Sequence, residues 1–277
     1  MILSLITGCG GTQQSGVDKP GNNFSGTEVK LGMITPLNST EEKMGNILGG
    51  IEESAGSKSK HLPKFYDNLR SMQMAVEAGE VQEISLYKCV ADYIIATNNK
   101  FEIVPDNALE KIAYSFCFAV RKDDAQLKAD LDKVIDEMKS DGTLDKLINE
   151  YIANVDKGQA PPKVEIPMTD GAETIKVGIT GDLPPLDYVS ADGQPAGFNT
   201  AMLAEIAKRL GRNIEVVDID SGARASALSS KFIDVVFWAI VPLGKDMPID
   251  LDKPEGLELS TPYFSDSVAH IRLKASK

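Results

Sequence analysis

The sequence has few of the residues that hold metals or form covalent cross-links. Among its 277 residues are three cysteines and two histidines, and Cys89 and Cys117 have no CxxC partner. A zinc site usually needs a fuller set of closely spaced Cys and His ligands. Long apolar runs are also missing, since none approaches the roughly 18 residues of a membrane span. We therefore expect no metal, no cofactor and no membrane-spanning helix.

Basic residues are the minority charge, with 29 Lys and Arg against 41 Asp and Glu and a net charge of -12. A nucleic-acid partner requires clustered Lys and Arg, so this balance argues against one. The sequence also lacks a nucleophile elbow and a phosphate loop, and its carboxylates are scattered. We therefore expect a protein that is not an enzyme.

Residues 1–27 form a polar, Gly- and Ser-rich tail behind a short apolar start, and such a tail cannot pack. Within it, the stretch ITGC ending at Cys9 resembles the bacterial lipobox. That resemblance implies a lipid-anchored, exported protein whose true start lies upstream. The alternative is an incidental cysteine in an unpacked tail. Export would permit a disulfide between Cys89 and Cys117, but both lie in apolar stretches, which favours two buried thiols.

Two parts of the chain repeat the same order of signals. The first runs from VKLGMI through KFYD and the helical pattern LRSMQMAVEAG to EISLY. The second runs from IKVGIT through TAMLAEIAKRL, IEVVDI and RASALSS to IDVVFW. Short apolar strands that alternate with amphipathic helices predict α/β units with mostly parallel sheets. For the helix TAMLAEIAKRL we expect Asn199 or Thr200 as N-cap and Gly211 as the stop.

The stretch MKSDGTLDKLINEY, 138–151, has the pattern of a terminal helix pair, yet many residues follow it. Behind it, residues 156–173 are rich in proline and have no sustained period, which is typical of a linker. We therefore predict an α/β domain over 28–155 that includes this helix pair, the linker 156–173, and a second α/β domain over 174–277.

These segments resemble the bacterial extracellular solute-binding proteins of family 3. The second half, from VGITGDLPPLDYVSADGQPAGFNTAMLAEIAKRLG to STPYFSDSVAHIRLK, resembles the family's first lobe. The first half, from LGMITPLNSTEEK to MKSDGTLDKLINEYI, resembles its second lobe and C-terminal helices. The resemblance implies a type II periplasmic-binding-protein-like fold, with two Rossmann-like lobes, a hinge and an interlobe cleft.

The lobes stand in swapped order, so the simplest account is a circular permutation. This rearrangement is tolerated where chain ends lie close together at the surface. The alternative is a piece of a tandem array that pairs half of one copy with half of the next.

The residues that hold an α-amino acid in the family are missing here. Trp238 and its apolar neighbours replace a Ser/Thr-rich run, and Asp246 stands near the place of the carboxylate-binding arginine. The acidic residue that takes the amino group falls at Tyr87, and the stacking aromatic falls at Leu183. Losing several charge-assisted hydrogen bonds would remove most of a micromolar affinity. The family's usual binding mode is therefore not expected.

The remaining candidates for ligand contact are aromatic, acidic, hydroxyl-bearing or basic residues at expected cleft positions. Ser39 and Thr40 open a helix, where Ser39 and Glu42 also have capping-box spacing, so a plain cap is the competing interpretation. The others equally suit turns, packing or solvated positions. The expected ligand-binding residues are Trp238, Tyr87, Asp182, Tyr188, Ser39, Thr40 and Arg224.

These observations predict a monomeric extracytoplasmic protein, lipid-anchored at Cys9. It would capture an amino-acid-like or related small molecule by closing two lobes, for the permease of an ABC-type importer. The alternative is an extracytoplasmic sensor or interaction module with a degenerate amino-acid site, whose partner is a membrane receptor. An enzyme that has reused the fold is the weakest alternative, because no catalytic domain is appended.

Overall fold

The computed structural model describes residues 26–105, 108–154, 160–190 and 192–275. The predicted lipidation site Cys9 lies outside these ranges. The strands of the described chain are β1 (Thr27–Ile34), β2 (Ser59–Tyr66), β3 (Glu83–Tyr87), β4 (Phe101–Ile103), β5 (Ala113–Arg121), β6 (Thr174–Ile179), β7 (Asp182–Leu183), β8 (Asp187–Val189), β9 (Pro195–Ala196), β10 (Asn213–Asp218), β11 (Val235–Leu243), β12 (Leu257–Leu259) and β13 (Phe264–Leu273).

The helices include seven α-helices and three short turns within the described ranges. They are α1 (Glu41–Ser54), α2 (Leu69–Glu77), α3 (Lys88–Thr97), α4 (Ala125–Ser140), α5 (Thr143–Ile148), α6 (Phe198–Leu210) and α7 (Arg224–Ser229), with the 3₁₀ turns η1 (Ala108–Lys111) and η3 (Ser221–Ala223) and the π turn η2 (Asn149–Ala153). None of the helices in these ranges is long and apolar enough to cross a membrane.

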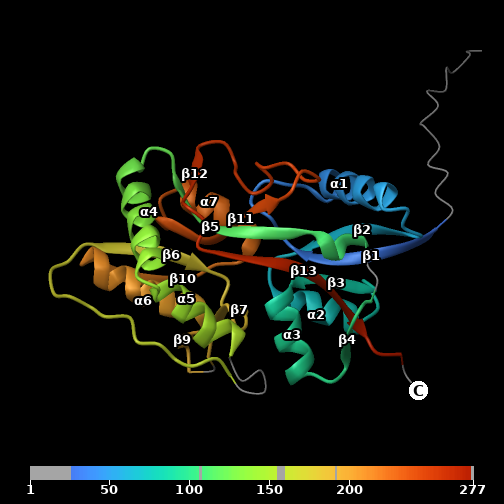
Figure 1. Cartoon of the computed structure of the whole chain (residues 1–277), viewed down its shortest axis with the longest axis horizontal. Helices are drawn as coiled ribbons and strands as arrows, with labels where there is room; N and C mark the ends of the chain where they lie inside the picture. The colour runs from blue at the N-terminus through green and yellow to red at the C-terminus, as the bar shows by residue number, and fades with distance from the viewer. Residues whose placement is uncertain (1–25, 106–107, 155–159, 191, 276–277) are drawn as a thin grey trace, which may run out of the picture.

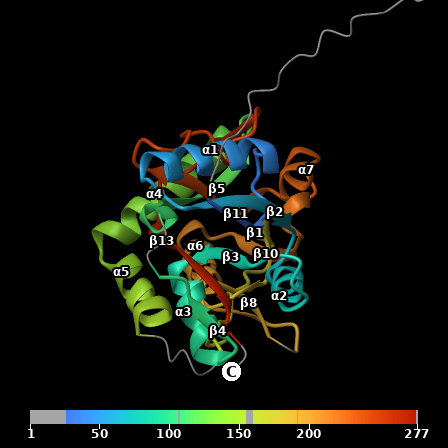
Figure 2. The ribbon, with the colours of Figure 1, turned by 90° about the vertical axis from the view of Figure 1, so that its right-hand side faces the viewer.

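Ten strands form one continuous sheet in the order β10-β6-β11-β5-β13-β3-β1-β2, with β12 beside β5 and β4 beside β13. The two predicted repeats form its two parallel parts, β1 between β2 and β3, and β6 between β10 and β11. Helix α1 lies on one face of the first part, and α2 and α3 lie on the other (Figures 1 and 2). The predicted α/β class, with two Rossmann-like parts of the type II periplasmic-binding kind, is confirmed.

Antiparallel strands join the two parts at the middle of the sheet (Figure 1). Strand β13 pairs with β5 through Phe264–Ser267 and then with β3 through Val268–Ile271, so it passes from one part to the other. Strand β5 pairs with β11 although the two come from different halves of the chain. The sheet therefore interleaves strands from both halves of the chain. The division of the chain into two domains at the linker 156–173 stays a prediction.

The terminal-looking helix pair packs onto the second half of the chain. Arg209 of α6 contacts Asp141 at 2.8 Å, between α4 and α5, and Arg212 contacts Asp130 of α4 at 3.2 Å. The linker beyond it is held by Asn213, whose Nδ2 donates to the Thr169 main-chain oxygen at 3.0 Å.

Two local predictions are wrong and one is confirmed. Helix α6 has Gly197 as its N-cap, with Asn199 and Thr200 buried inside the helix. Helix α1 is capped by Thr40, whose Oγ1 accepts from the Lys43 N–H at 3.1 Å, in place of the expected Ser39 and Glu42 box. A hydroxyl one residue further along does the same capping work. Gly211 ends α6 in the left-handed conformation, as expected.

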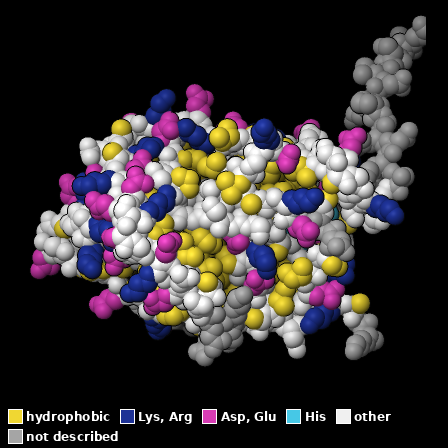
Figure 3. Space-filling model, viewed as in Figure 1, with side chains coloured by type: hydrophobic (Ala, Val, Ile, Leu, Met, Phe, Trp, Pro, Cys, Tyr) yellow, Lys and Arg dark blue, Asp and Glu magenta, His cyan; other side chains and the backbone are white. Residues whose placement is uncertain are grey.

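Both described cysteines, Cys89 and Cys117, are free thiols. Burial raises the pKa of Cys117 to about 12 and that of Cys89 well above its usual range. The face in Figure 3 shows acidic and basic side chains interspersed, so the acidic excess is not gathered into one patch there.

Candidate functional site

A polar and aromatic group, buried except for the partly exposed Tyr87, lies where the two parts of the sheet meet. It consists of Tyr87, Asp187, Arg224, Trp238 and Asp252, and we call it the junction cluster. Three of the seven predicted site residues belong to it: Trp238, Tyr87 and Arg224.

Trp238 is at the centre of the cluster. It lies on β11 at a bulge between Val236 and Ala239 and has a φ of 43°. A bulky side chain rarely adopts this left-handed backbone, and such strain gathers at functional sites. The ring is 3% exposed and meets Tyr87 edge-on, with centroids 5.4 Å apart. The bulge therefore turns the only Trp of the chain into the junction.

Arg224 packs on that ring, with its guanidinium carbon 4.9 Å from the ring centre. Its Nε donates to the Ser221 main-chain oxygen at 3.2 Å, and its Nη2 donates to that of Thr35 at 2.9 Å. Thr35 directly follows β1, so this one side chain bridges the two parts of the sheet. A buried guanidinium over an aromatic face is also a favourable cation–π arrangement.

Two buried carboxylates complete the cluster. Asp187 Oδ2 accepts from the Thr180 N–H at 2.9 Å and from Trp238 Nε1 at 3.4 Å. Asp252 accepts from the Ile240 N–H at 3.0 Å and from the Leu37 N–H. Burial raises the pKa of both carboxyls, and nearby Arg224 opposes this for Asp252.

Asp182 lies beside the cluster and forms a contact of its own across the junction. Its Oδ2 accepts from the N–H groups of Leu69 and Arg70, at 2.6 and 3.3 Å, in the first turn of α2. A carboxylate is favoured at a helix N-terminus. Burial nevertheless raises its pKa to about 6, because those hydrogen bonds oppose the desolvation only in part.

The other predicted residues lie elsewhere. The hydrogen bonds of Ser39 and Thr40 stay at the start of α1, where Thr40 is the cap. Tyr188 is the cross-strand neighbour of Asp182 in the β7–β8 hairpin and is half-buried. Asp187 and Asp252 were missed because a single acidic residue, whether at the start of a short strand or in a turn, gives no sequence signal of burial.

An apolar cavity of about 50 Å³ adjoins Tyr87. Residues from both parts of the sheet line it, including Met44, Tyr87, Tyr114, Leu183, Ile240 and Val268. One water needs a cavity of about 10–15 Å³, so this cavity has room for a few water-sized groups.

Residues 175–276 match the family of bacterial extracellular solute-binding proteins, family 3. The resemblance expected from the sequence is thereby confirmed for this segment, and the family that it matches consists of solute-binding domains. A comparison with curated protein sequences found no match.

Solved structures similar to the chain include binding domains. One is the ligand-binding component of an ABC-type import system from Staphylococcus aureus with zinc bound, at 10% identity and a TM-score of 0.44, covering 89% of this chain and 66% of that one. Another is the GluR0 ligand-binding core from Nostoc punctiforme in complex with L-glutamate, at 13% identity and a TM-score of 0.36, covering 88% of this chain and 84% of that one. The chain thus spans just under two thirds of the length of the first.

Proposed function

We propose that this protein captures a small solute between the two parts of its sheet and delivers it to the permease of an ABC-type importer. The protein works outside the cytoplasm as a monomer, held to the membrane by a lipid at Cys9. The observation that carries the proposal is the junction cluster, because it gathers charged and aromatic groups where a solute would bridge both parts.

The chemistry of the cluster favours an amino-acid-like or related ligand. Arg224 offers a planar guanidinium that suits a carboxylate. Asp187 and Asp182 offer carboxylates that suit an amine, and Trp238 and Tyr87 offer faces for a flat or apolar portion. These groups replace the family's hydroxyl run and arginine from different positions in the chain.

Capture requires an opening motion about the strands that join the two parts. Arg224, Asp182 and Asp252 already bond to main-chain groups of the opposite part, namely Thr35, Leu69 and Leu37. A solute must replace these bonds with its own, so its charges must match theirs. Movement about strands β5, β11 and β13 would expose the groups to it.

The test is thermal unfolding and calorimetry of the purified protein against polar and aromatic amino acids, small peptides and amines. A solute at about 100 times its Kd should stabilise the fold by roughly 2.7 kcal/mol. The variant Arg224→Met should lose the response to carboxylate ligands, whereas Arg272→Met, at an exposed arginine on β13, should keep it. A response that Arg224→Met leaves unchanged would place the ligand elsewhere.

One observation favours a sensor or interaction module instead. The cavity of about 50 Å³ is small, and direct hydrogen bonds already join the two parts. A closed junction that needs no solute would suit a protein that signals to a membrane receptor. No response across the whole panel, together with capture of one defined receptor domain, would support this function over transport.

A further inference from the structure

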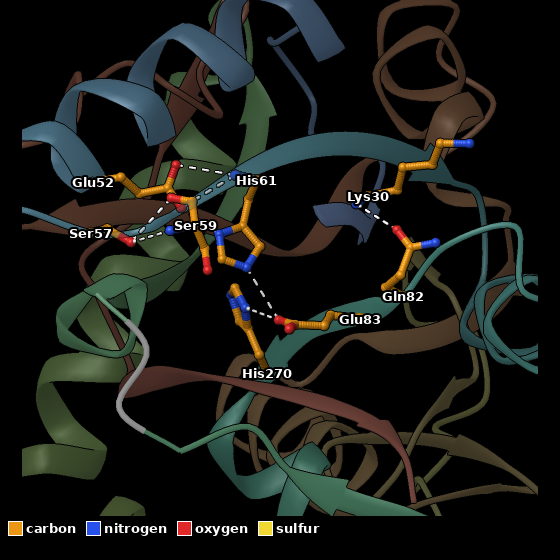
Figure 4. A network of polar contacts seen from close by, with 8 residues as sticks. All are labelled: Lys30, Glu52, Ser57, Ser59, His61, Gln82, Glu83 and His270. Carbon is orange, nitrogen blue, oxygen red and sulfur yellow. Dashed lines mark hydrogen bonds and ion pairs between the residues drawn. The ribbon is translucent and has the colours of Figure 1, made fainter. Parts of the chain in front are cut away.

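The only two histidines of the chain are far apart in the sequence, but they meet in a buried group. His61 of β2 and His270 of β13 have ring centres 5.1 Å apart, with the planes nearly perpendicular. Glu83 of β3 and Glu52 of α1 complete what we call the histidine–glutamate cluster (Figure 4). All four residues are at most 8% exposed.

Three ligand atoms converge within this cluster. Glu83 Oε2 lies 3.2 Å from His61 Nε2 and 3.2 Å from His270 Nδ1. The atoms that the three residues offer all lie within 4.8 Å of one another. In a tetrahedral zinc site with bonds of about 2.0–2.1 Å, neighbouring ligand atoms are about 3.3 Å apart. Two edges of the group therefore already have the spacing that such an ion requires.

Glu52 orients the first of these ligands. One of its oxygens bonds to His61 Nδ1, and Oε2 accepts from the His61 main-chain N–H at 3.1 Å. In the tautomer whose Nδ1–H donates to Glu52, Nε2 carries no proton and its lone pair points toward Glu83. A carboxylate that holds the far nitrogen of a histidine ligand is the usual outer support of a zinc site.

We propose that His61 Nε2, His270 Nδ1 and Glu83 form a binding site for a divalent transition-metal ion such as Zn²⁺, supported by Glu52. A second oxygen of Glu83 or a water would complete the coordination. The imidazole and carboxylate ligands favour Zn²⁺ over Mg²⁺ or Ca²⁺, which prefer oxygen alone. The site is independent of the proposed solute function.

The ion would act on the strand that joins the two parts of the sheet. His270 lies two residues beyond Val268, where β13 has passed from β5 to β3. Coordination would tie this strand to β2 and β3 at one point. Because the ligands are buried, the ion would enter during folding, and its binding energy would add to fold stability.

The test is to unfold the full chain with EDTA, refold it with or without ZnCl₂, dialyse it and measure metal content. We expect about one zinc per chain and a rise of at least about 5 °C in the midpoint of thermal unfolding. Refolding with Co²⁺ should give the intense visible absorption of tetrahedral coordination. A wild-type protein that retains no zinc, and is no more stable with it, would overturn the proposal. The cluster would then be held by its hydrogen bonds alone.

Variants separate the site from adventitious binding. His270→Gln should abolish zinc retention while circular dichroism confirms folding. Glu52→Gln, which leaves all three ligands in place, should weaken zinc binding by about 10–100-fold. The control Glu102→Gln changes a partly exposed glutamate on β4, next to β13, and should retain full zinc. Equal zinc in folded His270→Gln and wild-type protein would also overturn the proposal.

Discussion

Arg224 donates a hydrogen bond of 2.9 Å from Nη2 to the main-chain oxygen of Thr35, so the first residue of α7 is tied to the loop that follows β1. The two residues belong to different parts of the sheet. A guanidinium that is 2% exposed is costly to bury, and the cost is met only while its partners are in place. The contact therefore makes the junction sensitive to this one side chain.

We expect Arg224→Ala to lower the free energy of unfolding by about 3 kcal/mol. The substitution removes the bond to Thr35, the stacking on Trp238 and the positive charge near Asp252. Urea unfolding measures the change. Arg272→Ala is the matched control, because its single ion pair with Glu102 is largely exposed and should contribute less than about 1 kcal/mol. Equal losses in the two variants would contradict the bridging role.

Gly222→Ala should loosen the junction without disturbing either core. A Cβ at Gly222 would lie 2.5 Å from Asp67 Oδ1. That oxygen accepts from the Gly222 N–H at 3.1 Å and from Thr35 Oγ1 at 2.9 Å, and both bonds would be lost if Asp67 turned away. We expect a loss of about 1–3 kcal/mol in unfolding free energy. Small-angle scattering should also show a larger radius of gyration.

The control for this substitution is Gly50→Ala. Gly50 lies within α1, and a Cβ there would meet nothing within 4 Å. Alanine should raise the unfolding free energy by about 0.5–1 kcal/mol, because it favours the helix and restricts the unfolded chain. A more compact or unchanged Gly222→Ala protein would show that Asp67 does not hold the two parts together.

Asp182 should make the protein less stable as pH rises. Its folded pKa is about 6, above the usual 3.8, because burial and the neighbouring carboxylates of Asp187 and Asp218 outweigh the N–H groups of α2. The folded state therefore holds the proton more tightly than the unfolded state. The stability that this provides is complete below about pH 4 and is lost as pH rises through about 6.

Asp182→Asn should remove this dependence. An amide oxygen can still accept from the Leu69 N–H without carrying charge, so the variant should gain up to about 3 kcal/mol over wild type at pH 7 and little at pH 4. Urea unfolding at several pH values measures this. Asp192→Asn is the control, because the pKa of exposed Asp192 is lowered to about 2 and titrates outside this window. Parallel wild-type and Asp182→Asn profiles would contradict the shift.

Local sequence patterns predicted the units of the fold better than their assembly. Apolar runs such as those of β1 and β6, with amphipathic helices between strands, follow from burial alone. The stop at Gly211 follows from its left-handed backbone. The pairing of β5 with both β11 and β13 depends on long-range contacts, which hydrophobic period does not encode.

The candidate sites show the same limit. Trp238, Tyr87 and Arg224 were expected near a cleft because of their places in the family pattern, and the structure brings them together. Their roles as ligand contacts stay predictions. His61 and His270 were set aside as too few for a metal, because only the folded strands show that they meet. Distance along the chain hides such a cluster from any motif.

Trp238 offers a direct measurement of the junction, because it is the only Trp in the chain. At 3% exposure its emission should be blue-shifted, and acrylamide should quench it only weakly in the folded protein. Gly222→Ala should raise the quenching constant severalfold, since separation of the two parts uncovers the indole, whereas Gly50→Ala should leave it unchanged.

A solute that replaces the bonds of Arg224 and closes over Trp238 should lower quenching again in the Gly222→Ala protein. Strong quenching of the folded wild type, close to that in denaturant, would mean that the junction is open in solution and that Arg224 does not hold it closed.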